Sequence, residues 1–257
     1  EVFNELLLRK DVVSFNVLMA GFAQRGLIDE ALDCLKKMKN KCVSPNAITY
    51  VSILKACAVS GSLGKGEKIH TEVKKQGLIE TSQILGPTLV DMYANCGELR
   101  KAREVFDQLQ VHDVISWSAL ICGYAKHGFG HEALNCFRQM QHEGVHPDNV
   151  TFINVLKACC SIGSLERGCN LHAEIVGKGL ESELAIGNTL VDMYSKCGDI
   201  DEASSILHRL PNRNVVSWSA LIAGYAQVDQ NHEALDCFEQ LQKEGLSPNE
   251  VTFTCIL

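Results

Sequence analysis

The sequence predicts an all-α fold, a right-handed-type superhelical solenoid of stacked helix-turn-helix repeats. One observation behind this prediction is a segment that recurs as SFNVLMAGFA, SWSALICGYA and SWSALIAGYA, beginning at Ser14, Ser116 and Ser217. A second is that TLVDMY recurs at the same interval, from Thr88 and from Thr189. An interval of about one hundred residues, filled by shorter related units, is the signature of a repeat architecture.

The third observation is helical periodicity inside each unit, which residues 114–148 illustrate. The first half of this unit carries apolar side chains at i, i+3, i+4 and i+7, namely Trp117, Leu120, Ile121 and Tyr124. The second half carries them at i, i+4 and i+7, namely Ala133, Phe137 and Met140. The unit is therefore expected to form two amphipathic helices. No strand-like alternation competes with this interpretation.

The expected helix ends follow from glycine, proline and capping residues. Gly128 and Gly130 are expected to end the first helix, because glycine adopts the left-handed conformation at little cost. Gly144 is expected to end the second helix, and the proline that follows prevents its continuation. Asp148 or Asn149 can then cap the first helix of the next unit.

A single helical hairpin cannot cover both of its apolar faces, so neighbouring hairpins must stack. Hydrophobic residues make up 46% of the 257 residues. No apolar run approaches the roughly 18 residues of a membrane span, so we expect no membrane partner. Both ends of the sequence cut through repeat units. We therefore expect a piece of a longer protein that is a monomer in its full-length form.

The sequence has twelve cysteines, and several of them recur with the repeat. Cys57 and Cys159 occupy one repeat position, and Cys34, Cys136 and Cys237 occupy another. Residues so far apart along a rigid solenoid cannot form disulfides with each other. We therefore expect these cysteines to be small core residues of a reducing compartment.

The units resemble pentatricopeptide repeats. VISWSALICGYAKHGFGHEALNCFRQMQHEGVHPD resembles the standard type, TFINVLKACCSIGSLERGCNLHAEIVGKGL the long variant, and TLVDMYSKCGDIDEASSILHRLPNRN the short variant. Their order resembles the plant PLS-type subfamily, whose members mostly serve organellar RNA editing. The resemblance divides the single solenoid, residues 1–257, into standard motifs at 12–46, 114–148 and 215–249, long motifs at 47–82, 149–183 and from 250, and short motifs at 1–11 (end only), 83–113 and 184–214.

The resemblance implies sequence-specific binding of single-stranded RNA at one base per repeat. It implies that the RNA is a mitochondrial or chloroplast transcript, targeted for C-to-U editing or other processing, with organellar editing cofactor proteins as further partners. The repeats themselves are expected to have no enzyme activity and no cofactor, although family members can carry a deaminase domain after them. The alternative is a protein–protein interaction scaffold of the tetratricopeptide-like kind. The unit lengths disfavour this alternative, and the acidic charge favours it.

The second position of each motif is aliphatic. Side chains at equivalent positions of stacked hairpins form a line, and an aliphatic line can stack on bases. Packing at each helix start is the competing interpretation, and the resemblance favours stacking. The residues concerned are Val13, Ile48, Ile84, Ile115, Val150, Ala185, Val216 and Val251.

The resemblance places base reading at the fifth and last positions of each motif. The pairs that fit are Asn16 with Asn46, Ser118 with Asp148, Asn188 with Asn214, and Ser219 with Asn249. Such side chains can hydrogen-bond a base edge, although a last-position Asn or Asp is also a good helix cap. By resemblance, the sequence bound from the motif at residue 12 onward is 5′-Y-n-n-G-n-Y-A.

Three motifs depart from this pattern. The short motif at 83–113 pairs Pro87, which has no polar side chain, with Asp113. The long motifs carry Val51 and Ile153 at the fifth position, where neither can donate or accept a hydrogen bond. We expect the long motifs to act as spacers and base reading at the short motif to be weak.

The net charge is −7, from 24 Lys and Arg against 31 Asp and Glu, whereas RNA binding usually needs a basic surface. Acidic pairs such as Asp29–Glu30 and Asp201–Glu202 begin second helices. Negative side chains at these positions stabilise the N-terminal ends of the helices. We expect these ends to lie away from the RNA, with Lys126 and Lys196 near it as weak phosphate contacts.

No metal site is expected. His70 and His172 each begin a His-x-Glu triplet, the first half of a zinc-deaminase signature. No Cys-x-x-Cys follows either of them, and both occupy one repeat position, which indicates a structural role.

Overall fold

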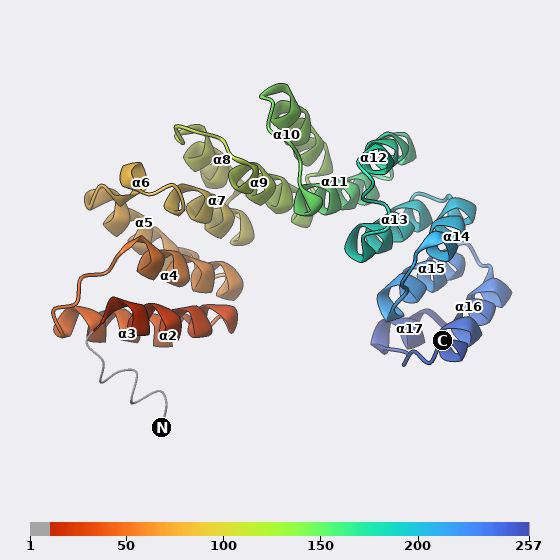
Figure 1. Ribbon diagram of the computed structural model, residues 1–257, viewed down its shortest axis with the longest axis horizontal. Helices are drawn as coiled ribbons and strands as arrows, with labels where there is room; N and C mark the ends of the chain where they lie inside the picture. The colour runs from red at the N-terminus through yellow and green to blue at the C-terminus, as the bar shows by residue number, and fades with distance from the viewer. Residues whose placement is uncertain (1–10, 257) are drawn as a thin grey trace. The chain divides into compact units, whose positions relative to one another are not determined.

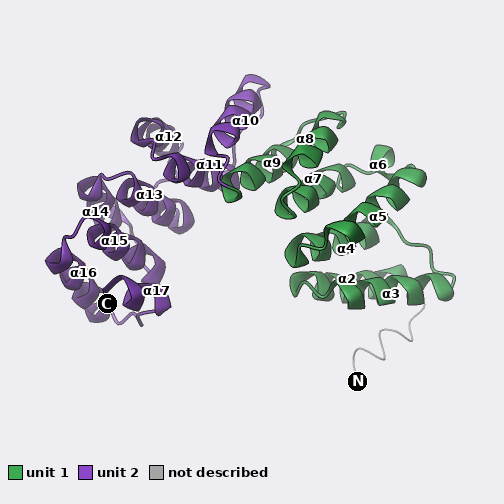
Figure 2. Cartoon of the chain, turned by 180° about the vertical axis from the view of Figure 1, so that it is seen from behind, with its two compact units in different colours: residues 1–127 green, residues 128–257 purple. Residues whose placement is uncertain are grey.

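The computed structural model describes residues 11–256, and every regular element in that range is a helix (Figure 1). The chain divides into two compact units, residues 1–127 and residues 128–257 (Figure 2). The short-motif end predicted at residues 1–11 lies, except for Asp11, outside the described residues.

The helices of the first unit are α2 (Val12–Gln24), α3 (Ile28–Asn40), α4 (Ala47–Ser60), α5 (Leu63–Lys75), α6 (Leu78–Thr81), α7 (Leu85–Asn95), α8 (Leu99–Asp107) and α9 (Val114–Lys126). Those of the second unit are α10 (Gly130–His142), α11 (Asn149–Ile162), α12 (Leu165–Gly177), α13 (Leu184–Lys196), α14 (Ile200–Arg209), α15 (Val215–Gln227), α16 (Asn231–Lys243) and α17 (Glu250–Ile256).

Within each unit, the helices form hairpins that stack on one another. The first helices of successive hairpins pack in series, as α2, α4, α7 and α9 in one unit and as α11, α13, α15 and α17 in the other. Each second helix packs against the first helix of the next hairpin, as α3 does against α4 and α14 against α15. The predicted architecture of stacked helical hairpins is confirmed.

The predicted apolar faces form the core. Trp117 and Trp218 occupy the same motif position, and each is only 1% exposed. On α10, Ala133, Phe137 and Met140 are all buried, as their spacing predicts. Burying such side chains stabilises the fold by roughly 1.5–3 kcal/mol each. Stacking is therefore what gives each hairpin its stability.

The helix ends match the sequence prediction at three of four points. Gly128 and Gly144 have φ of 81° and 74° and follow the ends of α9 and α10, and Asp148 caps α11. The prediction for Gly130 was wrong, because this residue begins α10 instead of ending α9. A Cβ at Gly130 would lie 2.7 Å from the carbonyl oxygen of Ala158, so the close approach of α10 to α11 requires glycine there.

All twelve cysteines are free thiols. Cys57 and Cys159 are fully buried, and burial raises the pKa of their thiols to about 11 and about 12. The predicted core role is wrong for Cys237, which is only partly buried, unlike its repeat counterparts on α3 and α10. Cys42 and Cys169, which follow no such repeat, are exposed.

Candidate nucleic-acid interface

Most first helices begin at a side-chain cap supplied by the residue just before them. Asn46 is the cap of α4: its Oδ1 accepts a hydrogen bond from the Thr49 backbone N at 3.1 Å and lies 3.0 Å from the Thr49 hydroxyl. The Thr49 hydroxyl in turn accepts from the Asn46 backbone N at 3.1 Å, which completes a capping box. The same reciprocal pairs are Asp148 with Thr151, Asn214 with Ser217, and Asn249 with Thr252.

The fifth-position side chains bond to these caps. The Asn16 amide nitrogen donates to Asn46 Oδ1 at 3.2 Å, and the Thr49 hydroxyl donates to Asn16 Oδ1 at 2.7 Å. The second unit repeats this arrangement with distances of 3.3 and 2.6 Å among Asn188, Asn214 and Ser217. The fifth and last positions are thus brought together, with the third residue of the following motif between them.

The standard motifs show how deeply the fifth position lies. Asn16, Ser118 and Ser219 are only 8%, 7% and 5% exposed. The Ser219 hydroxyl lies 2.7 Å from the Thr252 hydroxyl. Ser118 belongs to the first unit and Asp148 to the second. The sequence indicated open hydrogen-bonding groups at the fifth position, and the structure places them instead in contact with polar groups of the protein.

The capping bonds decide which atom of the last residue remains available. A backbone N–H can only donate, so the capping atom must be an oxygen. The amide nitrogens of Asn46, Asn214 and Asn249 then have no hydrogen-bond partner within residues 11–256. Asp148 caps with Oδ1 alone, so its Oδ2 also has no hydrogen-bond partner within residues 11–256. An Asn therefore presents a donor and an Asp presents an acceptor.

The second-position residues are exposed side chains at the starts of the first helices. Their exposed fractions lie between 47% and 65% for Val13, Ile48, Ile84, Ile115, Val150, Val216 and Val251, and Ala185 is exposed too. Core packing at the helix start does not account for aliphatic side chains that remain this open to solvent.

The two predicted phosphate-contacting lysines differ in their surroundings. The Lys126 ammonium donates to the Asn95 side-chain oxygen at 3.0 Å. The Lys196 ammonium forms an ion pair with Asp192 on its own helix at 2.8 Å. Lys126 therefore keeps a charge that no carboxylate within residues 11–256 contacts directly, whereas the charge of Lys196 is largely compensated.

The motifs that depart from the pattern also do so in the structure. Pro87 is buried at the start of α7, and Asp113 caps α9 by accepting from the Ser116 backbone N at 2.8 Å. Val51 and Ile153, the fifth residues of the long motifs, are partly exposed. None of these three motifs presents a polar fifth-position side chain.

Sequence reasoning missed the third position of most motifs, although a signal for it was present. A Ser or Thr stands three residues after each Asn or Asp that caps a first helix, and the hydroxyls of Thr49, Ser217 and Thr252 tie the cap to the fifth-position side chain. The pairs are Asp11 with Ser14, Asn46 with Thr49, Asp113 with Ser116, Asp148 with Thr151, Asn214 with Ser217, and Asn249 with Thr252.

The histidines of the rejected zinc signature pack against tyrosines. The Nδ1 atoms of His70 and His172 lie 2.9 Å from the hydroxyls of Tyr93 and Tyr194. Among the residues that the structure describes, no cluster of His, Cys, Asp or Glu is arranged to hold a metal ion. None of the helices between residues 11 and 256 has the length and apolar character to cross a membrane.

A solenoid of helical hairpins with a polar position repeated at the starts of its first helices defines a helical repeat protein. Comparison with family models identifies the family of repeats. A model described as the PPR repeat family matches residues 10–59, 112–161 and 213–257. A second, described as a PPR repeat, matches residues 48–78, 88–114 and 188–215. The chain belongs to the pentatricopeptide repeat (PPR) family.

Its relatives include longer plant proteins. A chloroplastic pentatricopeptide repeat-containing protein of Arabidopsis thaliana is 37% identical over 253 residues, which are 98% of this chain and 41% of the relative. A mitochondrial one from the same plant is 36% identical over 258 residues, 100% of this chain and 37% of the relative. The chain thus spans less than half the length of these relatives.

A solved structure has the same fold. The crystal structure of the pentatricopeptide repeat protein PPR10 in complex with an 18-nucleotide psaJ RNA element matches with a TM-score of 0.77 and 21% identity. The match covers 96% of this chain and 37% of PPR10. At this identity the match shows the fold, an all-helical stacked repeat array.

Proposed function

We propose that the chain binds single-stranded RNA in a sequence-specific manner, with one nucleotide facing each motif. The observation that carries the proposal is the repeated cap at the starts of the first helices. The caps at Asn46, Asp148, Asn214 and Asn249 each leave one donor or acceptor without a partner among residues 11–256, and an exposed aliphatic side chain follows two residues later. A base that stacks on the aliphatic side chain can present its edge to the polar atom. The RNA complex of PPR10, which shares this fold, supports the proposal.

The unpaired atoms refine the predicted base preferences. An amide N–H matches a ring nitrogen that accepts, as in cytosine and adenine, and a carboxylate matches a ring N–H, as in guanine and uracil. Asn46 and Asn214, predicted to face pyrimidines, therefore favour cytosine over uracil. Asp148 favours guanine, and Asn249 favours adenine. The site bound by residues 12–249 becomes 5′-C-n-n-G-n-C-A.

The motif boundaries support the same assignment of one nucleotide per hairpin. We place standard motifs at 12–46, 114–148 and 215–249, long motifs at 47–82 and 149–183, and short motifs at 83–113 and 184–214. Each of these intervals holds two main helices. The PLS arrangement and a role in C-to-U editing of organellar transcripts rest on the motif order. Chloroplastic and mitochondrial relatives support an organellar location.

Competitive binding at fixed salt tests the proposal, with a labelled oligonucleotide carrying 5′-CAAGACA as the probe. Competitors change one of the four assigned nucleotides at a time, and each change is expected to weaken competition. Changes at the second or fifth nucleotide, which face the long motifs, serve as controls and are expected to have little effect. Equal competition by every oligonucleotide, or no RNA binding at all, would refute the proposal and favour the protein-scaffold alternative.

A further inference from the structure

The first unit contains a cavity of about 460 Å³ beside the short motif at 83–113, where the fifth-position residue is a proline. Its volume falls in the range of about 300–1,000 Å³ in which proteins bind small molecules. The segments around it are the end of α5, the connection through α6 to α7, and the loop from α8 to α9. Both Pro87 and Asp113, the fifth and last residues of the motif, line it.

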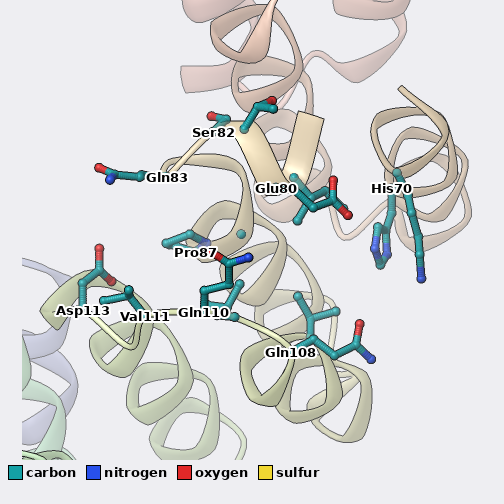
Figure 3. A pocket seen from close by; sticks show the side chains of 15 residues that line it. His70, Glu80, Ser82, Gln83, Pro87, Gln108, Gln110, Val111 and Asp113 are labelled. Atoms are coloured by element: carbon teal, nitrogen blue, oxygen red, sulfur yellow. The ribbon is translucent and has the colours of Figure 1, made fainter. Parts of the chain in front are cut away.

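The cavity extends from the candidate interface toward the second helices. Figure 3 shows Asp113, Pro87 and Gln83 on one side of it and His70 on the opposite side, with Gln108 and Glu80 between the two sides. At the standard motifs, the fifth-position side chain fills the space beside the cap with a bonded polar group. At this short motif, a base that reaches the cap meets an opening.

The lining suits the edge and faces of a base. Gln83, Gln108 and Gln110 supply amide groups that form no hydrogen bond with other residues of the described chain. Pro87 and Val111 supply apolar surface. An extruded base is bound in this way, by hydrogen bonds to its edge and by stacking on apolar side chains.

The far end of the cavity also offers unused hydrogen-bonding groups. Nδ1 of His70 is bonded to a tyrosine hydroxyl, whereas its Nε2 has no hydrogen-bond partner within residues 11–256. Lys74, four residues after His70 on α5, and Glu80 also line the cavity, and neither forms an ion pair with a described residue. Donors and acceptors are therefore both present, as they are along the edge of a base.

In the second unit, an ion pair bridges the corresponding place. There Arg209, the counterpart of Gln108, forms an ion pair with Glu181 at 2.8 Å. The same Glu181 carboxylate oxygen lies 3.3 Å from Nε2 of His172, the counterpart of His70. An arginine thus ties the second helix of the short motif to the preceding connection, and the shorter, uncharged Gln108 makes no such bond.

We propose that the base of the RNA nucleotide facing the short motif at 83–113 enters this cavity and is held between Pro87 and the amides of Gln83 and Gln110. The proposal rests on the proposed RNA-binding function. The acceptor presented by Asp113 selects a base with a ring N–H, so the third nucleotide of the site is uracil or guanine. The short motif at 83–113 is then a specific reader through its cavity, and the absence of a polar fifth-position side chain bonded to the cap is what makes room for the base.

The test combines an RNA lacking the third base with a variant that closes the cavity. Removing one stacked base weakens binding roughly 5- to 150-fold, and we expect a loss in that range for a 5′-CAUGACA oligonucleotide that is abasic at its uracil. The Gln108→Arg substitution reproduces the bridge of the second unit. It is expected to abolish the difference between the intact and abasic RNAs, and Gln110→Trp is expected to do the same by filling the cavity. An abasic second nucleotide is the matched control, and its effect should be the same in all three proteins.

A difference at the third nucleotide that persists in both variants would overturn the cavity proposal. A photo-crosslinking measurement provides a test without a substitution. An RNA with 4-thiouridine at the third position is expected to crosslink to Gln83, Pro87 or Gln110, and crosslinks confined to α9 would also overturn the proposal. If the unmodified protein fails to discriminate at the first, fourth, sixth and seventh nucleotides, the RNA-binding function itself fails, which separates the two outcomes.

Discussion

Replacing Asn249 by Asp exchanges the presented atom while keeping the cap. The Asn249 Oδ1 accepts from the Thr252 backbone N at 2.9 Å and from its hydroxyl at 2.8 Å, and an aspartate oxygen accepts both equally well. The amide N–H that we assign to adenine becomes a carboxylate oxygen, which repels the accepting ring nitrogen of adenine and accepts from the ring N–H of guanine. The seventh nucleotide should therefore change from adenine to guanine, with a change in discrimination of about 1–3 kcal/mol, or roughly 5- to 150-fold.

The assay is competitive binding with oligonucleotides that differ only at the seventh base, at one salt concentration. The reciprocal substitution, Asp148→Asn, should move the preference at the fourth nucleotide from guanine toward adenine. Asn249→Ala is the control: it should lose the preference and also about 1 kcal/mol of stability, because the cap is lost. If Asn249→Asp binds with unchanged affinity and still prefers adenine, Asn249 is only a helix cap and the assignment of readout atoms is wrong.

Three other substitutions test separate parts of the structure. Thr49→Val leaves the bonded oxygen of a buried asparagine unsatisfied, so urea denaturation should show a loss of about 1–3 kcal/mol; an unchanged midpoint would mean that this bond is dispensable. Gly123→Ala places a Cβ 2.5 Å from the Cβ of Ala94 on α7 and should lower the free energy of unfolding by about 1–3 kcal/mol. Gly64→Ala is the control, because its Cβ would have nothing within 4 Å and should not destabilise the protein. Similar losses in both variants would contradict the packing argument. Lys126→Gln should make the salt dependence of RNA binding shallower by about 0.7 in log–log slope, and Lys196→Gln should change it less; equal changes would show that the ion pair of Lys196 opens on binding.

Much of the fold could be predicted because each hairpin carries its own local signals. Apolar spacing placed Trp117 and Phe137 in the core, and capping chemistry placed Asp148 at the start of a helix. Gly130 was misassigned because its role comes from a close approach between helices, which no local pattern records. The fifth position was harder still. A polar residue such as Asn16 indicates a solvent-facing group when only its own helix is considered, and the bonds that bury it come from the next motif.

The acidic net charge becomes easier to reconcile with RNA binding once the ion pairs are located. Asp29 at the start of α3 pairs with Lys65 of α5 at 2.6 Å, and Lys39 at the end of α3 pairs with Glu72 of α5 at 2.5 Å. These pairs join the second helices of neighbouring motifs and compensate carboxylates there. Because exposed charges are screened over about 8–10 Å at physiological salt, the local balance at the interface matters more than the total of −7. Of the two lysines expected near the RNA, Lys196 is paired with a carboxylate and Lys126 is not. Base stacking and edge contacts then remain the main source of affinity, so RNA binding by this chain should depend more on sequence than on salt.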